Sequence, residues 1–541
     1  MKVPALLNSM RRGGSPKGQT APERSPELVP PCLEIDALAA LEPDFSRFAI
    51  ADASKHRLAC VVHEASPAWL MTDRTDHAVQ ALAFLIAPDA CERLLWTTED
   101  DFAQWLERST ASVAALDGAT QAASPDADGS HSTATGDELS LAAIGHEQHA
   151  VVRLVSSTLF DALKVGASDV HLESTARGLA IKFRLDGVLS QAGAVESRTL
   201  AEQSISRIKV LAELDIAERR VPQDGRLTVQ YRRRSIDVRV SIMPSVHGED
   251  VVLRILDREH LASSLEGLTL AKLGFDDDTA ARFRRLCVRP YGMVLVTGPT
   301  GSGKTTTLYA ALAETSNPRE KVVTIEDPVE YQLPGVLQIP VNERKGLSFA
   351  RGLRSILRHD PDRILVGEVR DAETAEIAVQ SALTGHLVYT TVHANNALDA
   401  LARLLQLGVD RYALTAAVSG VLAQRLVRIA CPQCRQPYEP CAAQLEASAI
   451  DPTRMAGARP IRTIGCTSCH GTGYRGRRAI GELLVLTPAL KTALGERREQ
   501  SELESAALAG GWVSLREQAV RLALSGETTL EEIDRVTMVD R

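Results

Sequence analysis

The segment at residues 298–305 reads Gly-Pro-Thr-Gly-Ser-Gly-Lys-Thr, and it constrains the fold more than any other part of the chain. It follows the apolar run 293–297, which predicts a buried strand, and precedes residues 306–313, which predict a helix. A glycine-rich loop that ends in Lys-Thr between a strand and a helix is the pattern of a phosphate-binding P-loop. The alternative is a glycine-rich turn before an ordinary helix, which the flanking strand and helix together disfavour.

This pattern indicates triphosphate chemistry. The glycines let the backbone fold around an oxyanion so that several N–H groups point inward, and the helix N-terminus adds the positive end of its dipole. Lys304 can reach the β- and γ-phosphates, and the Thr305 hydroxyl can bind Mg²⁺. The pattern therefore predicts a bound nucleoside triphosphate with Mg²⁺, and the ATPase motifs described below identify the nucleotide as ATP. The predicted nucleotide-binding residues are Gly298, Pro299, Thr300, Gly301, Ser302, Gly303, Lys304, Thr305 and Thr306.

Length and composition bound the remaining possibilities. A chain of 541 residues is too long for one core and predicts three or four domains. The net charge of −8 argues against bulk electrostatic binding to nucleic acid. No run of 18 or more apolar residues is present, and the N-terminus does not have the pattern of a secretory signal, so a membrane span is not expected.

Composition shifts along the chain predict five segments. Two are rich in small or polar residues and read as a disordered tail and a flexible linker. Three read as folded: a small αβ partner-binding domain, an α+β domain with several strands, and a nucleotide domain that contains the P-loop. In chain order the segments are the tail at 1–34, the αβ domain at 35–112, the linker at 113–140, the α+β domain at 141–260 and the nucleotide domain at 261–541.

Acidic residues and histidines follow the apolar runs of the nucleotide domain. The run 321–330 ends in Glu326, Asp327 and Glu330, which would lie near the phosphates if its strand neighbours the P-loop strand. The run 363–368 ends in Glu368 and resembles a Walker B segment. A third run, 384–393, carries His386 and His393 near its ends. Each run alone is weak evidence, but together they favour a parallel-sheet ATPase core.

The arginine-rich loop at 219–226 admits two interpretations. A solvated surface loop is the ordinary one for such a charged run. The alternative is that Arg220, Arg226 or Arg239 supplies positive charge to a phosphoryl-transfer site, which the P-loop further along the chain makes more attractive.

Two C-x-x-C pairs, separated by 31 residues, predict a metal centre at about 428–480. Four thiolates suit a closed, tetrahedral structural Zn²⁺ site with no catalytic position, and reduced buried cysteines are the alternative. The predicted ligands are Cys431, Cys434, Cys466 and Cys469, while Cys441 and His470 are left out. From Gly481 onward the chain reads as mostly helical, with a plausible capping box at Thr528 and Glu531.

These ordered motifs together resemble the secretion ATPase superfamily, and specifically the GspE/PulE-type assembly motors of type II secretion and type IV pili. The resemblance covers roughly residues 145–541, whereas the first 140 residues match poorly. It rests on the P-loop with its following helix and on the segments 167–173, 183–187, 221–226, 326–330, 360–371, 384–388 and 422–428. Residues 304–307 and 326–331 look more like the type II secretion branch.

The resemblance implies a RecA-like core preceded by a PAS-like α+β domain. It implies that Glu330 activates the attacking water, that Glu368 organises Mg²⁺ and water, and that His386 and His393 couple to nucleotide state. Arg220, Arg226 and Arg239 would reach the nucleotide when the two domains close. Members form homohexamers at the cytoplasmic face of the inner membrane, where a recruiting protein and a platform protein are their partners.

The expected function is therefore ATP hydrolysis that drives pseudopilus assembly in type II secretion. A type IV pilus extension motor would use the same chemistry on a different cargo. A nucleotide-gated scaffold without appreciable turnover is disfavoured by the acids at positions 330 and 368. A nucleic-acid translocase is disfavoured by the acidic net charge and by the absence of an aromatic-basic stripe.

Overall fold

The computed structural model describes residues 33–109 with short gaps, Leu139, residues 149–257 and residues 269–538. The chain divides into two compact units, residues 1–113 and residues 114–541. The predicted tail and the predicted linker lie outside the described residues except for Leu33 and Leu139. Among the described helices, none has both the length and the apolar character needed to cross a membrane.

The first unit is a small αβ fold, as the sequence predicts. Its sheet has the order β1-β2-β3-β4, with antiparallel neighbours except for the parallel pair β3 and β4. Trp69 is fully buried at its centre and meets Phe48 edge to face, with 5.3 Å between ring centroids. The elements are α1 (Ile35–Leu38), β1 (Glu42–Pro43), β2 (Leu58–His63), β3 (Ser66–Met71), α3 (His77–Ile86), β4 (Leu94–Trp96) and α4 (Glu99–Ser109).

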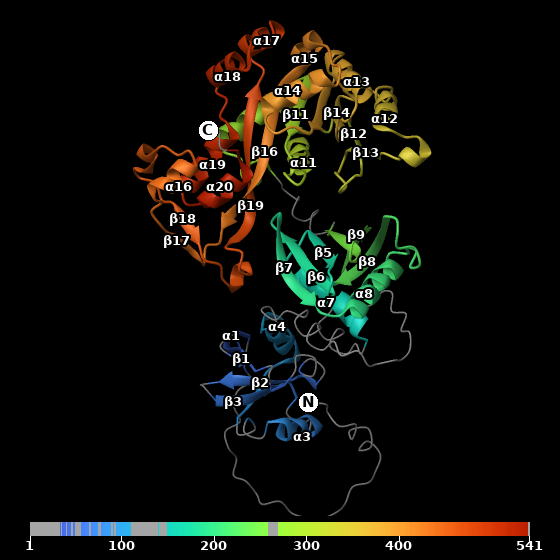
Figure 1. The fold of residues 1–541 in the computed structure, drawn as a ribbon, viewed down its shortest axis with the longest axis vertical. Helices are drawn as coiled ribbons and strands as arrows, with labels where there is room; N and C mark the ends of the chain where they lie inside the picture. The colour runs from blue at the N-terminus through green and yellow to red at the C-terminus, as the bar shows by residue number, and fades with distance from the viewer. Residues whose placement is uncertain are drawn as a thin grey trace, which may run out of the picture. The chain divides into compact units, whose positions relative to one another are not determined.

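The second unit begins with a six-stranded antiparallel sheet of order β7-β6-β5-β10-β9-β8 that packs against two helices (Figure 1). Asp186 and Gly187 both have positive φ, 47° and 84°, as a tight hairpin between β6 and β7 requires. The PAS-like assignment of this domain stays a prediction. The elements are α7 (Ala150–Lys164), β5 (Asp169–Ser174), β6 (Leu179–Leu185), β7 (Val188–Val195), α8 (Arg198–Leu211), β8 (Gln223–Tyr231), β9 (Arg234–Ser245) and β10 (Gly248–Leu256).

A seven-stranded sheet of order β13-β12-β14-β15-β11-β16-β19 forms the rest of the unit's frame, and only β19 is antiparallel to its neighbour. Every residue of β11 and β15 is buried, because helices cover both faces. Met293 and Leu295 of β11 enter one core, while Val294 and Val296 enter the other. The mixed α/β core with a parallel sheet confirms the coarse fold prediction, and the finer RecA-like label stays a prediction.

Strands form in each of the apolar runs predicted for this domain and a helix follows the glycine-rich loop, whereas the other elements were not predicted individually. The elements are α10 (Asp277–Cys287), β11 (Gly292–Thr297), α11 (Lys304–Thr315), β12 (Val322–Glu326), β13 (Leu337–Pro340), α12 (Phe349–Ile356), β14 (Arg363–Val366), α13 (Ala372–Leu383), β15 (Leu387–Val392), α14 (Ala397–Gln406) and α15 (Arg411–Ala417).

Two long strands, β16 (Val418–Ala430) and β19 (Tyr474–Val485), carry the cysteine-rich part of the chain between them. That part contains a two-stranded sheet and one α-helix. Four helices follow β19 and pack on the main core. The elements are β17 (Arg435–Pro437), α16 (Ala442–Ala447), β18 (Ile461–Thr463), α17 (Pro488–Gly495), α18 (Gln500–Ala509), α19 (Leu515–Leu524) and α20 (Leu530–Val536).

The chain from Gly481 onward is mostly helical, as the sequence predicts, but two local details differ. Residues 481–485 are not helical but finish β19, because their backbone pairs with β16. The helix cap is also shifted by one residue. Thr529, not Thr528, caps α20 by accepting a hydrogen bond from Glu532 N–H at 3.2 Å, because the Thr528 hydroxyl donates to Arg428 O at 2.8 Å.

Candidate nucleotide site and metal centre

The P-loop joins the end of β11 to the start of α11, and its glycines are required by geometry. Gly301 and Gly303 have φ of 78° and 84°, and Gly303 caps α11. A Cβ on Gly298 would lie 2.5 Å from the main-chain oxygen of Gln424 on the neighbouring strand β16. The loop therefore has a tightly packed floor, and α11 directs its N-terminus out of the sheet as an anion site needs.

Lys304 is folded back onto this loop. Its ammonium donates to Gly298 O at 2.9 Å and to Pro299 O at 3.1 Å. Burial lowers the pKa of Lys304, while the charge of Glu368 opposes that shift. Thr305 is exposed on the first turn of α11, so its hydroxyl is free to face a cation. The loop's residues thus fit a bound triphosphate with Mg²⁺.

Glu368 and His393 lie at the same edge of the sheet as the P-loop. Glu368 follows β14 and His393 follows β15, and the order β14-β15-β11 places these strand ends side by side. The Glu368 carboxylate lies 3.4 Å from His393 Nε2 and also pairs with Arg370. The strand order thus places Lys304, Glu368 and His393 at the same edge of the sheet, where the charge of Glu368 opposes the lowering of the Lys304 pKa.

The strand that ends in Glu326 does not neighbour the P-loop strand, because β14 and β15 lie between β12 and β11. The sequence places Glu326, Asp327 and Glu330 near the phosphates only if β12 neighbours β11, and this condition is not met. Glu326 is buried and points into the protein, where it accepts hydrogen bonds from the Tyr309 hydroxyl, from Thr324 at 2.5 Å and from Gln338 at 3.2 Å. Its carboxylate fixes the strand end to the P-loop helix and is not available to water.

Glu330 approaches the P-loop helix by a different route. The loop after β12 folds back so that the Tyr331 ring meets the Tyr309 ring of α11 edge to face, with 4.4 Å between centroids. Burial raises the pKa of Tyr309, and the charges of Glu326 and Glu330 add to this shift. Glu330 thus lies near α11, and among the described residues it has no ion-pair partner.

His386 is placed at the other end of β15 from His393. Its ring nitrogen lies 3.0 Å from Ser381 O, and its carbonyl accepts from Gly292 N–H at the start of β11. Because β15 and β11 are parallel, His386 sits at the edge opposite the P-loop. The structure does not bring His386 to the other candidate residues.

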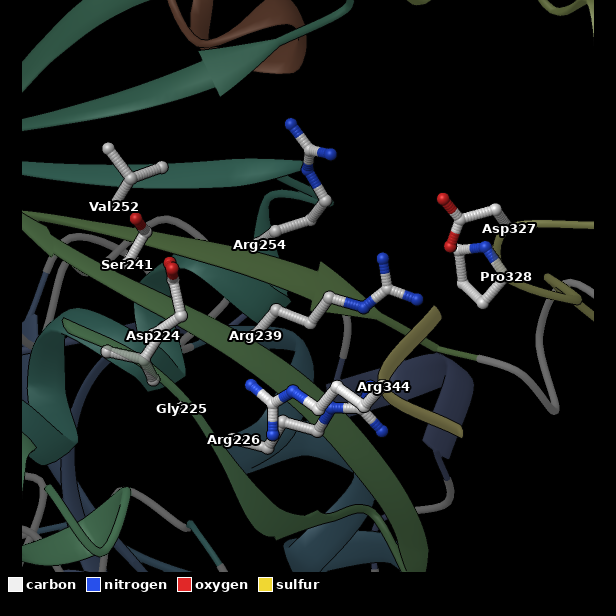
Figure 2. Close-up of a pocket in the computed structure, with 11 residues that line it drawn as sticks. Asp224, Gly225, Arg226, Arg239, Ser241, Val252, Arg254, Asp327, Pro328 and Arg344 are labelled. Atoms are coloured by element: carbon white, nitrogen blue, oxygen red, sulfur yellow. The ribbon is translucent and has the colours of Figure 1, made fainter. Parts of the chain in front are cut away.

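Arginines gather in a cleft of about 730 Å³ that lies between the antiparallel sheet and the loop after β12. Figure 2 shows Arg239 of β9 extended toward Asp327 and Pro328. The lining residues are Asp224, Gly225, Arg226, Arg239, Val240, Ser241, Val252, Arg254, Asp327, Pro328 and Arg344. Two of the three predicted arginines line this cleft, together with Arg254 and Arg344, which the sequence did not single out.

Arg220 does not line the cleft. Its side chain is 88% exposed and pairs with Glu218 at 2.9 Å, which holds the pKa of Glu218 at about 2. Two more residues were missed beside the P-loop. Gln424 donates to Ser302 O, and Arg425 donates to Asn395 O in the loop after His393. Their place in the long apolar run of β16, one strand from the P-loop strand, is the signal that could have identified them.

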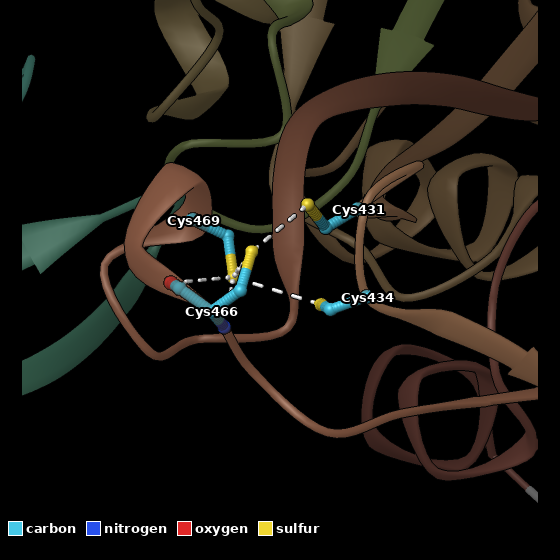
Figure 3. Close-up of side chains that lie close together, drawn as sticks. All are labelled: Cys431, Cys434, Cys466 and Cys469. Carbon is cyan, nitrogen blue, oxygen red and sulfur yellow. Dashed lines mark hydrogen bonds between the residues drawn. The ribbon is translucent and has the colours of Figure 1, made fainter. Parts of the chain in front are cut away.

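The four predicted cysteines form one cluster in the second unit (Figure 3). Their sulfurs all lie within 4.8 Å of one another, and three of the pairs are 3.7–3.8 Å apart. Zn–S bonds of about 2.3 Å in a tetrahedron place sulfurs about 3.8 Å apart, so the arrangement fits zinc. Among the described residues, neither Cys441 nor His470 belongs to this cluster.

Backbone N–H groups prepare one of these thiols for metal binding. Burial disfavours the thiolate of Cys469, but the N–H groups of Cys466 and Gly473 donate to its sulfur at 3.2 Å each. These donors lower the pKa of Cys469 to about 7. Gly465 precedes the first donor and Gly473 is the second, and both have the positive φ of 79° that these turns require.

A P-loop at the carboxyl edge of a parallel sheet, with a glutamate and a histidine from the two adjoining strand ends, defines a P-loop ATPase. A family model described as "Type II/IV secretion system protein" matches residues 145–535. The chain therefore belongs to the type II/IV secretion system protein family, in which it is a type II secretion ATPase of the E group.

Two relatives support this assignment over most of the chain. Type II secretion system protein E of Dickeya dadantii (strain 3937) is 47% identical over 394 residues, which is 73% of this chain and 77% of that protein. Type II secretion system ATPase E of Vibrio cholerae serotype O1 is 45% identical over 387 residues, 72% of this chain and 75% of that protein.

A solved structure shares the fold. The ATPase DotB of Legionella pneumophila has a TM-score of 0.50 and 21% sequence identity, and the match covers 70% of this chain and 94% of that chain. At this identity, the comparison speaks to fold alone.

Proposed function

We propose that the chain is the motor ATPase of a type II secretion machine, which hydrolyses ATP at the 298–305 loop to drive pseudopilus assembly. The observation that carries the proposal is that Lys304, Glu368 and His393 lie at one edge of the sheet. Lys304 and the loop N–H groups would hold the triphosphate, with Mg²⁺ on Thr305 supplying charge neutralisation.

Hydrolysis requires a water aligned with the γ-phosphate. Glu330, near α11 and without an ion-pair partner among the described residues, would orient or deprotonate that water. Glu368 would organise Mg²⁺ and water on the side of the site next to Lys304. His393, held 3.4 Å from Glu368, would report the nucleotide state to that carboxylate.

The arginine cleft supports a coupling of hydrolysis to movement. Arg226 and Arg239 belong to the antiparallel sheet, whereas Asp327 and Pro328 belong to the loop after β12 of the nucleotide domain. In P-loop enzymes, an arginine that meets the developing charge is worth about 10³–10⁵ in rate. Closure of the cleft on the nucleotide would therefore convert binding and release into a domain rotation. Arg220 lies outside the cleft and His386 lies at the sheet edge opposite the P-loop. Their predicted roles would require a different conformation of the protein, in which both approach the nucleotide.

The proposal extends to the assembly. The chain would act as a homohexamer at the cytoplasmic face of the inner membrane, reached through a recruiting protein and a platform protein. Type II secretion is favoured over pilus extension because the relatives above carry type II names.

The experiment that tests the site is Lys304→Ala in purified full-length protein. Loss of the ammonium removes the group that reaches the β- and γ-phosphates, so steady-state phosphate release should fall to background. Lys321→Ala, a lysine on the opposite edge bonded to His359 O, is the matched control and should retain turnover. Unchanged hydrolysis by Lys304→Ala would refute the P-loop assignment.

A further inference from the structure

Gln424 is a polar residue in a place where the fold calls for an apolar one. It is fully buried on β16, between Ala423 and the half-buried Arg425. In the register of β11 and β16, Thr297 faces Ala423, so Gln424 lies alongside the first residue of the P-loop. Burying an amide there costs free energy unless the amide forms hydrogen bonds.

The side chain of Gln424 contacts the P-loop backbone directly. Its Nε2 donates to the carbonyl oxygen of Ser302 at 2.6 Å. The Gln424 main-chain oxygen forms the floor under Gly298, as the 2.5 Å clearance for a Cβ there shows. β16 therefore holds the loop near both of its ends.

The orientation of one peptide plane follows from this bond. The carbonyl of Ser302 and the N–H of Gly303 belong to the same trans peptide group, so they point in opposite directions. With the Ser302 carbonyl held against β16, the Gly303 N–H is turned away from β16 and toward the side where a phosphate would lie. Gly303 also caps α11, so this N–H adds to the positive helix end.

The unused atoms around this bond favour a positioning role. Gln424 Oε1 and Ser302 Oγ are both buried, and neither has a hydrogen-bond partner among the described residues. A glutamine kept only to satisfy its own polarity would have its acceptor paired as well as its donor. Here only the donor is engaged, and its partner is the loop.

We infer that Gln424 is a positioning residue for nucleotide binding, which orients the Gly303 N–H by holding the Ser302 carbonyl. The inference rests on the proposed triphosphate site at the 298–305 loop. Gln424 acts through the loop and does not touch the nucleotide. It should matter for ligands that carry a β-phosphate, because the loop N–H groups face that part of the ligand.

The test uses Gln424→Met and Gln424→Asn in the full chain. Methionine keeps the length but cannot donate, and asparagine keeps the amide but is one methylene too short for the 2.6 Å bond. Both variants should bind Mg²⁺-ADP roughly tenfold more weakly in a calorimetric titration, the size of effect expected for one disturbed hydrogen bond to a charged group. KM for ATP should rise more than kcat falls.

The matched control is Gln518→Met. Gln518 of α19 donates to the carbonyl oxygen of Gly481 at the same distance, 2.6 Å. Gly481 pairs with Gln424 across the two strands, but it lies on β19, one strand further from the P-loop strand β11. Because Gln518 both donates to and accepts from the Gly481 backbone, this variant should lower the melting temperature but leave ADP affinity unchanged. Wild-type ADP affinity in both Gln424 variants overturns the inference, as does an equal loss in Gln518→Met. If Lys304→Ala also binds ADP normally, the triphosphate site itself is misplaced.

Discussion

Three carboxylates near the P-loop sheet differ in their surroundings, and those surroundings decide what each can do. Glu326 is enclosed by the donors Tyr309, Thr324 and Gln338. Glu368 is 16% exposed and shared between Arg370 and His393. Glu330 has no ion-pair partner among the described residues. A carboxylate that must accept a proton from water needs a free oxygen, which favours Glu330 as the base.

Glu330→Gln should therefore bind ATP normally but hydrolyse it slowly. Removing a general base typically costs about 10²–10⁴ in rate, because the water is no longer deprotonated in step with attack. Single-turnover hydrolysis alongside equilibrium ATP binding measures the two effects separately. Glu326→Gln is the control, and it should reduce thermal stability more than turnover. Normal turnover by Glu330→Gln would move the role to Glu368.

At the scale of single elements, α20 is anchored by a buried charge cluster. Glu532 is 1% exposed and accepts hydrogen bonds from Arg428 of β16 at 2.8 Å and from Arg535 at 2.6 Å. The Arg428 guanidinium also lies 3.9 Å from the centroid of the Tyr474 ring of β19. One carboxylate thus joins α20 to the two long strands.

Glu532→Ala should destabilise the protein by about 3–5 kcal/mol, because it leaves the Arg428 charge buried without its partner. Glu531→Ala, an exposed neighbour on the same helix, should have little effect. Urea unfolding at neutral pH measures both. Equal urea midpoints for the two variants would show that the cluster does not contribute to the free energy of unfolding.

The same cluster predicts a pH dependence. Burial opposes ionisation of Glu532, but the hydrogen bonds from Arg535 and Arg428 outweigh it and lower the pKa of this carboxyl. The stabilisation is therefore fully present above the ordinary glutamate pKa of about 4.3 and is lost as pH falls through the lowered value. The gap between wild type and Glu532→Ala should narrow below about pH 4.

Elements with a strong local pattern were predictable, and their assembly was not. β11 and α11 follow from a buried apolar run, a glycine-rich loop and a helix former. The position of Glu326 does not follow, because strand order places two strands between β12 and β11 and no local pattern encodes that order. The strand at residues 481–485 was predicted as the start of a helical region, because a fully buried strand and a buried helix share the same apolar composition.

At the scale of the whole molecule, the cysteine cluster is the test of metal content. Purified protein should contain about one equivalent of zinc, and Cys431→Ser should lose it and unfold at a lower temperature, because metal binding contributes folding free energy. Cys441→Ser is the matched control, since this exposed thiol lies outside the cluster and should keep the metal. Less than about half an equivalent, with freely titratable thiols, would reject the site.

The long strand β16 passes alongside the P-loop at Gln424 and ends at Ala430, directly before Cys431. At about 3.3 Å per residue, the seven steps from Gln424 to Cys431 span at most about 23 Å, and the pairing with β19 has one register shift in this stretch, between Arg428 and Ala430. Hydrogen bonds to β19 along one side stiffen this stretch. One continuous strand, β16, thus links the P-loop to the cysteine cluster. Because β16 connects the two sites directly, a partner that displaced the cysteine cluster would act on the P-loop through the backbone of this strand.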